Sequence, residues 1–254
     1  MKDRFSSHAV QYAAFRPTYP RELYDFIFGH LDHYDIAWDA GTGNGQVARD
    51  LAIKFTWVKA TDISPQQLKN AYPANNISYS LAAEATQFPD KTFDLITVAQ
   101  AIHWFNLIPF YAEVRRVAKP NALLAVWGYG LLRIVPKIDS ALDHFYKAIV
   151  GPYWDKERKL IDEHYRTLPF PFDEIESPGF PFSFRWTLDE FQGYLSTWSS
   201  VQKYKTDKGV DPVESFIEEI RPVWKGEVQT VKFPLFLRMG RIGNGNREGR
   251  RIGK

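Results

Sequence analysis

The stretch DAGTGNGQ, residues 39–46, places three glycines at alternate positions between an apolar run and an amphipathic one. Glycine inside a regular element costs roughly 0.5–1 kcal/mol relative to alanine, so three together need a physical reason. Either the chain turns sharply here, or another group approaches its backbone closely. The apolar run IAWDA (36–40) predicts a short buried strand before the glycines, and QVARDLAIKF (46–55) predicts a helix after them.

Apolar and amphipathic runs go on alternating as far as residue 130. Ser64 followed by Pro65 is a favourable helix start, so a second helix is predicted to begin there. Another helix is predicted over 107–119, and further strands are predicted over 57–62, 77–82, 93–99 and 122–128. Strands that alternate with helices predict a doubly wound α/β fold with a mostly parallel sheet, whose ligands bind at the carboxyl ends of the strands.

The pattern changes after Gly130. Apolar residues recur at helical spacing from Ile138 to Ile149, and a stretch rich in proline and phenylalanine follows. We therefore expect a helical insertion over about 131–180, after the fifth strand, which is too short to hold a core of its own.

Alternation then returns in the last third of the chain. The run FSFRW (182–186) predicts a further strand, and KFPLFLRMG (232–240) predicts a final one. Pro234 suits an edge strand or the first residue of a strand better than the interior of a sheet. Thr187 and Glu190 have the spacing of a capping box, which predicts that a helix begins after Thr187.

The composition limits the class of protein. No apolar run approaches the roughly 18 residues that cross a bilayer, so we expect a cytoplasmic protein with no membrane partner. The chain has no cysteine, which excludes disulfides and cysteine nucleophiles, and no metal site is expected. Its net charge is +2, but residues 241–254 hold five cations and one acid, a net charge of +4, so the rest of the chain has a net charge of about −2. The remainder lacks the broad basic face that nucleic acids require, so no nucleic-acid partner is expected.

A carboxylate follows the glycines at a distance that fits a nucleotide-like ligand. Asp62 ends the second predicted strand, where it could accept hydrogen bonds from both hydroxyls of a ribose. The dinucleotide fingerprint G-x-G-x-x-G would need glycine at position 46, where the chain has Gln46. Alternatively, the glycines form only a tight turn and Asp62 caps the next helix. The glycines after the first predicted strand and Asp62 at the end of the second, taken together, favour the binding of a nucleotide-like ligand over this structural alternative.

On these residues the chain resembles the class I S-adenosylmethionine-dependent methyltransferases, from about residue 9 to 242. AWDAGTGNGQ is similar to the first motif of that family, ATDIS to its ribose-binding acid, and AAEATQFPDKTFDLITVAQAIHW to its adenine loop and fourth strand. The resemblance implies S-adenosyl-L-methionine as cofactor and a seven-stranded sheet with an antiparallel last strand, in which FSFRW and KFPLFLRMG would be strands six and seven. It implies the following cofactor contacts: Gly41 and Gly43 at the methionine part, Asp62 at the ribose, and Ile63, Ala83 and Glu84 around the adenine. Asp39 and Ala99 are also assigned to the cofactor site.

Two further stretches, YAAFRPTYP (12–20) and AIHWF (101–105), are similar to a small-molecule branch that includes the trans-aconitate methyltransferases. The resemblance implies one domain over 1–242, with a lid over about 1–30 that closes on the cofactor. Residues 243–254 are expected to form a disordered basic tail. Arg16 is assigned to the cofactor, because it could pair with the methionine carboxylate, although a carboxylate of the substrate or a surface ion pair would also suit it.

The expected substrate is a small organic molecule, and Tyr12, Tyr19 and Trp104 are predicted to contact it. Methylation of a carboxylate needs no base, whereas methylation of a hydroxyl benefits from one. His103 is the only histidine beside the expected pocket and is therefore the candidate catalytic residue. It could instead contact a ligand or pack the loop after the fourth strand.

Two other functions stay open, a non-catalytic domain that binds S-adenosylmethionine and a nicotinamide-dependent oxidoreductase, against which Gln46 argues. The sequence leaves the oligomeric state open.

Overall fold

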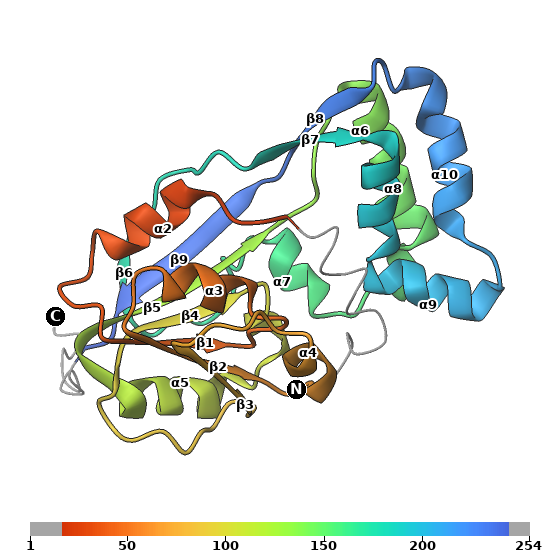
Figure 1. Cartoon of the computed structure of the whole chain (residues 1–254). Helices are drawn as coiled ribbons and strands as arrows, with labels where there is room; N and C mark the ends of the chain where they lie inside the picture. The colour runs from red at the N-terminus through yellow and green to blue at the C-terminus, as the bar shows by residue number, and fades with distance from the viewer. Residues whose placement is uncertain (1–16, 244–254) are drawn as a thin grey trace, which may run out of the picture.

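The structure is a computed structural model, which describes residues 17–243 (Figure 1). One sheet of seven strands has the order β3-β2-β1-β4-β5-β9-β6. The first five strands pair in parallel, whereas β9 runs antiparallel to both of its neighbours, β5 and β6. The doubly wound, seven-stranded, mostly parallel sheet is therefore confirmed. Its strands are β1 (Ile36–Ala40), β2 (Trp57–Asp62), β3 (Ile77–Leu81), β4 (Phe93–Ala99), β5 (Ala118–Tyr129), β6 (Asp173–Ile175) and β9 (Leu235–Arg241).

Helices cover both faces of this sheet, and Figure 1 shows α5 on the face opposite to α2 and α3. Successive strand residues point to opposite faces, so neighbouring side chains of β1 enter different cores. Trp38 lies in the same core as Phe110 of α5, while Ala37 lies in the core that holds Leu51 of α3. The flanking helices are α2 (Arg21–Phe28), α3 (Gln46–Ala52), α4 (Pro65–Lys69) and α5 (Leu107–Val117).

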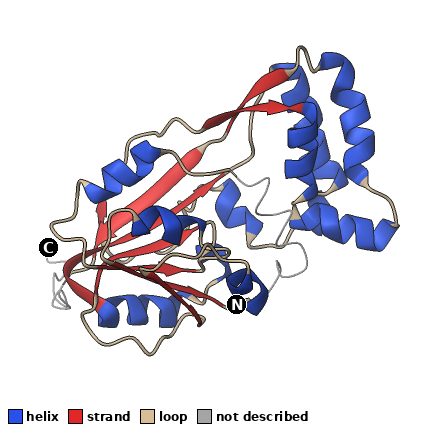
Figure 2. Cartoon of the chain, in the orientation of Figure 1, coloured by secondary structure: helices blue, strands red, loops and turns tan. Residues whose placement is uncertain are grey.

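A second group of helices stands beyond the sheet and forms what we call the helical lobe (Figures 1 and 2). Its core joins the segment after β5 to residues much later in the chain. Phe145, for example, stacks on Phe216 with 4.6 Å between ring centroids. The lobe contains α6 (Pro136–His144), the π-helix η3 (Phe145–Ile149), η4 (Gly151–Tyr153), α8 (Leu188–Ser196), α9 (Ser199–Lys208), α10 (Pro212–Ile220) and η5 (Arg221–Val223).

The last strands differ from the prediction. FSFRW was predicted to join the main sheet, but it forms β7 (Ser183–Thr187), which pairs with β8 (Val228–Lys232) in a separate ribbon. The main sheet takes β6 as its sixth strand instead, from within the segment predicted as an insertion. The predicted run 232–240 is divided at Pro234, because proline has no N–H to donate to a strand partner. Its first residue ends β8, and β9 begins at Leu235.

Two local predictions are confirmed. The Ser64 hydroxyl accepts a hydrogen bond from the N–H of Gln67 at 3.2 Å, and α4 begins at Pro65. Thr187 and Glu190 form the capping box at the start of α8. Within residues 17–243, none of the helices combines the length and the apolar character that crossing a bilayer requires.

Candidate functional site

The loop between β1 and α3 holds its three glycines in left-handed conformations, with φ of 70° at Gly41, 57° at Gly43 and 80° at Gly45. Side chains rarely tolerate these angles, which explains the glycines as turn residues. A Cβ on Gly41 would lie 2.8 Å from that of Ala101, and one on Gly45 would lie 2.2 Å from the Tyr79 hydroxyl. A Cβ on Gly43 would meet no atom of the described residues within 4 Å. Gly43 is therefore the glycine at which another molecule can approach the backbone.

Asp39 supports this loop from beneath. Its side chain is only 1% exposed, and its carboxylate accepts hydrogen bonds from the Thr42 hydroxyl at 2.5 Å and from the Thr97 hydroxyl at 2.7 Å. Burial raises the pKa of Asp39 to about 7, although both hydroxyl donors act to lower it. Asp39 thus supports the loop that carries Gly43, and its predicted contact with the cofactor stays a prediction.

Asp62 lies at the carboxyl end of β2, beside the open glycine. Its Oδ2 accepts from the N–H of Gly43 at 2.9 Å, and its Oδ1 accepts from the N–H of Ser64 at 2.9 Å. Two backbone donors therefore fix the orientation of a half-buried carboxylate. Ile63, also half-buried, follows it and precedes α4.

The ends of the next two strands complete this edge of the sheet. Ala83 and Glu84 follow β3 and are half-buried, as is Ala99 at the end of β4. Oε1 of Glu84 accepts a hydrogen bond from the N–H of Asn106 at 2.8 Å, which ties the loop to the start of α5. Since β1, β2, β3 and β4 are parallel neighbours, these side chains share one edge of the sheet.

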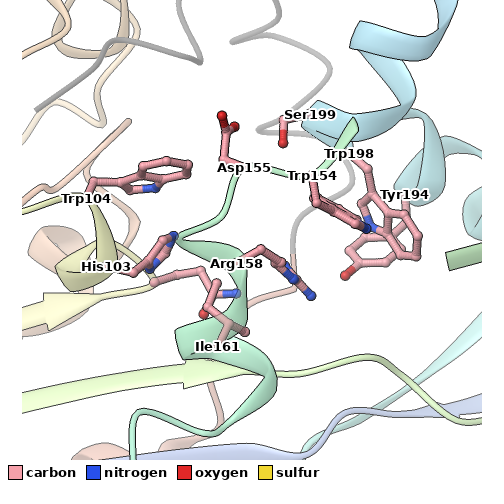
Figure 3. Close-up of a pocket in the computed structure, with 10 residues that line it drawn as sticks. His103, Trp104, Trp154, Asp155, Arg158, Ile161, Tyr194, Trp198 and Ser199 are labelled. Atoms are coloured by element: carbon pink, nitrogen blue, oxygen red, sulfur yellow. The ribbon is translucent and has the colours of Figure 1, made fainter. Parts of the chain in front are cut away.

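A cavity lies between this edge and the helical lobe, and we call it the aromatic cavity (Figure 3). Figure 3 shows His103 and Trp104 of η2 (Ile102–Trp104) on one side and the rings of Trp198 and Tyr194 on the other. Arg158, at the start of α7 (Arg158–Asp162), lies between the two sides. The residues that line the cavity are Gln100, His103, Trp104, Trp154, Asp155, Arg158, Ile161, Tyr194, Trp198 and Ser199.

His103 is buried and uncharged. Its Nδ1 lies 2.8 Å from the hydroxyl of Tyr165, and its ring centroid lies 4.7 Å from that of Trp104. Burial, with a smaller contribution from the charge of Arg158, lowers the pKa of His103 to about 3. The imidazole is therefore neutral around pH 7, and it is a weak base.

Arg158 brings a positive charge to the cavity wall. Its Nε donates to the Tyr146 hydroxyl at 2.8 Å and lies 3.5 Å from Asp162, while its guanidinium carbon lies 4.7 Å from the ring centre of Trp154. Tyr146 in turn donates to Asp162 at 2.7 Å. Among residues 17–243, these contacts engage Nε and the face of the guanidinium, and neither terminal nitrogen has a hydrogen-bond partner. The side chain is thus held by one edge, and its terminal donors are available to a ligand.

Comparisons with known proteins agree with this arrangement. A family model described as a methyltransferase domain matches residues 38–126, which run from β1 into β5. A protein of Dictyostelium discoideum, described as a methyltransferase, is 35% identical over 245 residues, or 92% of this chain and 93% of that protein. The chain belongs to the class I S-adenosylmethionine-dependent methyltransferases.

Two more relatives support the assignment. The solved structure of a protein of Anaeromyxobacter dehalogenans, described as a type II methyltransferase, has a TM-score of 0.84 and 38% identity, and the match covers 90% of this chain and 99% of that one. The methyltransferase cfoB of Aspergillus candidus is 29% identical over 66% of this chain and 63% of its own length. These descriptions do not mention trans-aconitate, and that branch stays a prediction.

Not every residue that was predicted to contact the substrate of this methyltransferase lies at the aromatic cavity. Trp104 and His103 line it, whereas Tyr19 does not. Tyr19 stacks on Phe182 with 5.8 Å between centroids and meets the ring of Trp127 edge-on at 5.6 Å. It therefore packs where the sheet adjoins the helical lobe. Tyr12 and Arg16 lie outside the described residues, as does most of the predicted lid.

Three residues at the cavity were not predicted: Gln100 and Arg158, which line it, and Tyr165, which contacts His103. Gln100 has a φ of 52°, and its side-chain amide makes two hydrogen bonds to the backbone of Tyr129, at 3.1 and 3.0 Å. It thereby joins the ends of β4 and β5 at the cavity. Arg158 and Tyr165 come from α7 and the turn after it, which the sequence suggested only as part of an insertion. Nothing in their local pattern distinguishes them from surface and core residues.

Proposed function

We propose that this methyltransferase methylates a carboxylate of a small organic molecule, which binds in the aromatic cavity. The observation that carries the proposal is the guanidinium of Arg158, held in the cavity wall beside a neutral histidine. A guanidinium presents paired N–H donors that match the two oxygens of a carboxylate. The rings of Trp104, Trp154 and Trp198 provide apolar walls for the rest of the molecule.

The residues at the sheet edge fit the cofactor, and we propose that they hold it. Gly43 leaves room for close approach to the backbone, and Asp62 is oriented to accept hydrogen bonds from ribose hydroxyls. Gly41, Ile63, Ala83, Glu84 and Ala99 complete the proposed contacts. When bound, S-adenosylmethionine supplies an activated methyl group.

The protein's own task in such a reaction is mainly alignment. A displacement needs its reacting atoms held in line and close together, in a site from which water is excluded. Arg158 can orient a carboxylate through both oxygens, and each oxygen keeps a second lone pair that can act as the nucleophile. The aromatic walls exclude water from these oxygens. No proton has to leave, so the reaction requires no base.

A hydroxyl acceptor is the second candidate, and the electrostatics of His103 argue against it. Removal of a hydroxyl proton needs a base whose pKa lies near the working pH. His103 has a pKa of about 3, which makes it inefficient in that role. We therefore replace the predicted catalytic base by a neutral contact residue, and the carboxylate becomes the favoured acceptor group.

An assay with labelled methyl groups tests this function. Small carboxylic acids are compared with the matching primary alcohols, phenols and amines, at equal concentration. The proposal predicts labelled product with acids, and brief alkaline treatment should release the label as methanol, because esters hydrolyse and methyl ethers do not. A product stable to alkali, or turnover confined to amines, would contradict it.

A further inference from the structure

A buried tyrosine contacts the histidine of the aromatic cavity from behind. Tyr165 is fully buried, and its hydroxyl lies 2.8 Å from Nδ1 of His103. The hydroxyl therefore occupies Nδ1, and Nε2 is the ring nitrogen that stays available to a ligand in the cavity. Two tautomers of a neutral imidazole are possible, and the bond made by one nitrogen decides which proton the other carries.

The backbone around Tyr165 takes an uncommon path to make this contact. His164 and Tyr165 follow α7 and both have left-handed conformations, with φ of 54° and 56°. Residues other than glycine keep a positive φ only where the surrounding structure holds them in it, and they are frequent at functional sites. The turn ends α7 and places the Tyr165 ring against Phe236, with 5.1 Å between centroids in an edge-on arrangement. The hydroxyl is thereby fixed under His103.

The direction of the hydrogen bond follows from the chemistry of the two groups. A phenol oxygen is a weak acceptor, whereas the lone pair of an imidazole nitrogen is a strong one. Burial raises the pKa of Tyr165 far above its usual value, so the phenol keeps its proton. The stronger arrangement therefore has the Tyr165 hydroxyl donating to Nδ1, which leaves the ring proton on Nε2.

We propose that Tyr165 is a positioning residue that holds His103 in its Nε2–H tautomer, so that the ring offers a hydrogen-bond donor to the acceptor molecule. Nε2–H of His103 and the guanidinium of Arg158 then present hydrogen-bond donors to the cavity from two sides. The carboxylate of Asp155 also lines the cavity, but it is paired with Lys203 at 2.6 Å. The donors of His103 and Arg158 therefore favour an oxyanion over an amine, whose N–H groups would face other donors. The selectivity rests on the function proposed above, whereas the tautomer does not depend on it.

The nitrogen-15 NMR spectrum of the full-length protein, with labelled histidines, tests the tautomer directly. The His103 signals are identified by their loss in His103→Asn. The wild type should show a protonated Nε2 and a bare Nδ1, with neither cofactor nor acceptor added. In Tyr165→Phe the two nitrogens should shift towards values averaged between tautomers. A wild-type ring protonated on Nδ1, or a spectrum unchanged in Tyr165→Phe, would overturn the proposal.

Tyr111→Phe is the matched control, because Tyr111 is buried nearby and its hydroxyl donates to the backbone carbonyl of Pro169 at 2.6 Å. This variant should leave the His103 signals unchanged. With an acid that is turned over, Tyr165→Phe should raise the KM for the acceptor roughly fivefold, as expected for one weakened hydrogen bond, with a smaller change in kcat. The affinity for S-adenosylmethionine should not change.

A double-mutant comparison keeps the kinetic test meaningful if Tyr165→Phe is less stable. Glutamine at position 103 carries its own N–H donors and has no tautomers. In the His103→Gln background, Tyr165→Phe should therefore leave the acceptor KM unchanged. An equal rise in both backgrounds would show that Tyr165 acts only by packing, and would refute its positioning role.

Discussion

Replacing Asp39 by asparagine should change how the stability of this methyltransferase depends on pH. Burial raises the pKa of this carboxyl from 3.8 to about 7 in the folded protein. Between pH 3.8 and about pH 7, Asp39 keeps its proton in the folded chain and has lost it in the unfolded chain. The free energy of unfolding therefore falls as the pH rises through this range. At about 1.36 kcal/mol per pH unit, the whole effect is about 4 kcal/mol, of which about 3 kcal/mol falls between pH 5 and pH 8.

Asparagine has no proton to exchange, so the variant should lack this contribution. At about pH 5, Asp39→Asn should cost about 1–2 kcal/mol, because an amide reproduces the contacts with Thr42 and Thr97 imperfectly. At about pH 8 the cost should vanish or reverse, because the wild type then carries a buried charge. Urea unfolding of both proteins at several pH values, followed by circular dichroism, measures the difference, in which the titration of all other groups cancels. If the free energies of unfolding of the two proteins differ by the same amount from pH 5 to pH 8, Asp39 does not take up a proton on folding.

Two further predictions concern the cofactor loop. Gly43→Ala should lower the free energy of unfolding by about 1–2 kcal/mol, because alanine is strained at this left-handed φ. It should also weaken the binding of S-adenosylmethionine, measured by calorimetry. Gly45→Ala should lower the free energy of unfolding more than Gly43→Ala does, because its Cβ would also overlap Tyr79. A Gly43→Ala protein with wild-type affinity would show that the open side of the loop is not the binding side. Asp62→Ala should weaken cofactor binding by about 1–3 kcal/mol, the cost of leaving a buried partner unpaired, and an unchanged dissociation constant would remove Asp62 from the ribose site.

The sequence predicted the sheet edge well, because the signals there are local. The three glycines have to adopt positive φ, and strands β1, β2, β4 and β5 contain apolar runs, with helices between most of the successive strands. Parallel pairing then brings Gly43 and Asp62 together without further information. The order of such elements limits the topology to few choices.

The helical lobe could not be predicted in the same way. β6 has only three residues, with the sequence DEI, and no alternation that could identify a strand. β7 does alternate, but alternation alone does not say which strand is its partner. The lobe is built from segments on both sides of β6, so its core depends on contacts between distant residues.

Some residues of the aromatic cavity could be predicted from the sequence, and others could not. His103 and Trp104 follow β4 and could be proposed from their position, but the chemistry of His103 depends on burial and on Tyr165. Arg158 reaches the cavity only because α7 packs between the sheet and the lobe. A single arginine among charged neighbours carries no sign of that placement in the sequence.

Steady-state kinetics of Arg158→Gln show whether Arg158 binds the carboxylate that becomes methylated. Lys159→Gln is the matched control, because Lys159 is the next residue of α7 and its side chain is 78% exposed. With an acid acceptor, Arg158→Gln should raise KM roughly 10- to 100-fold, as expected for a lost charge-assisted hydrogen bond. Its affinity for S-adenosylmethionine should stay close to that of Lys159→Gln, whereas its melting temperature should be lower, because the contacts of Arg158 with Tyr146 and Asp162 are also lost. An acceptor KM in Arg158→Gln equal to that of the control, with turnover intact, would contradict the account.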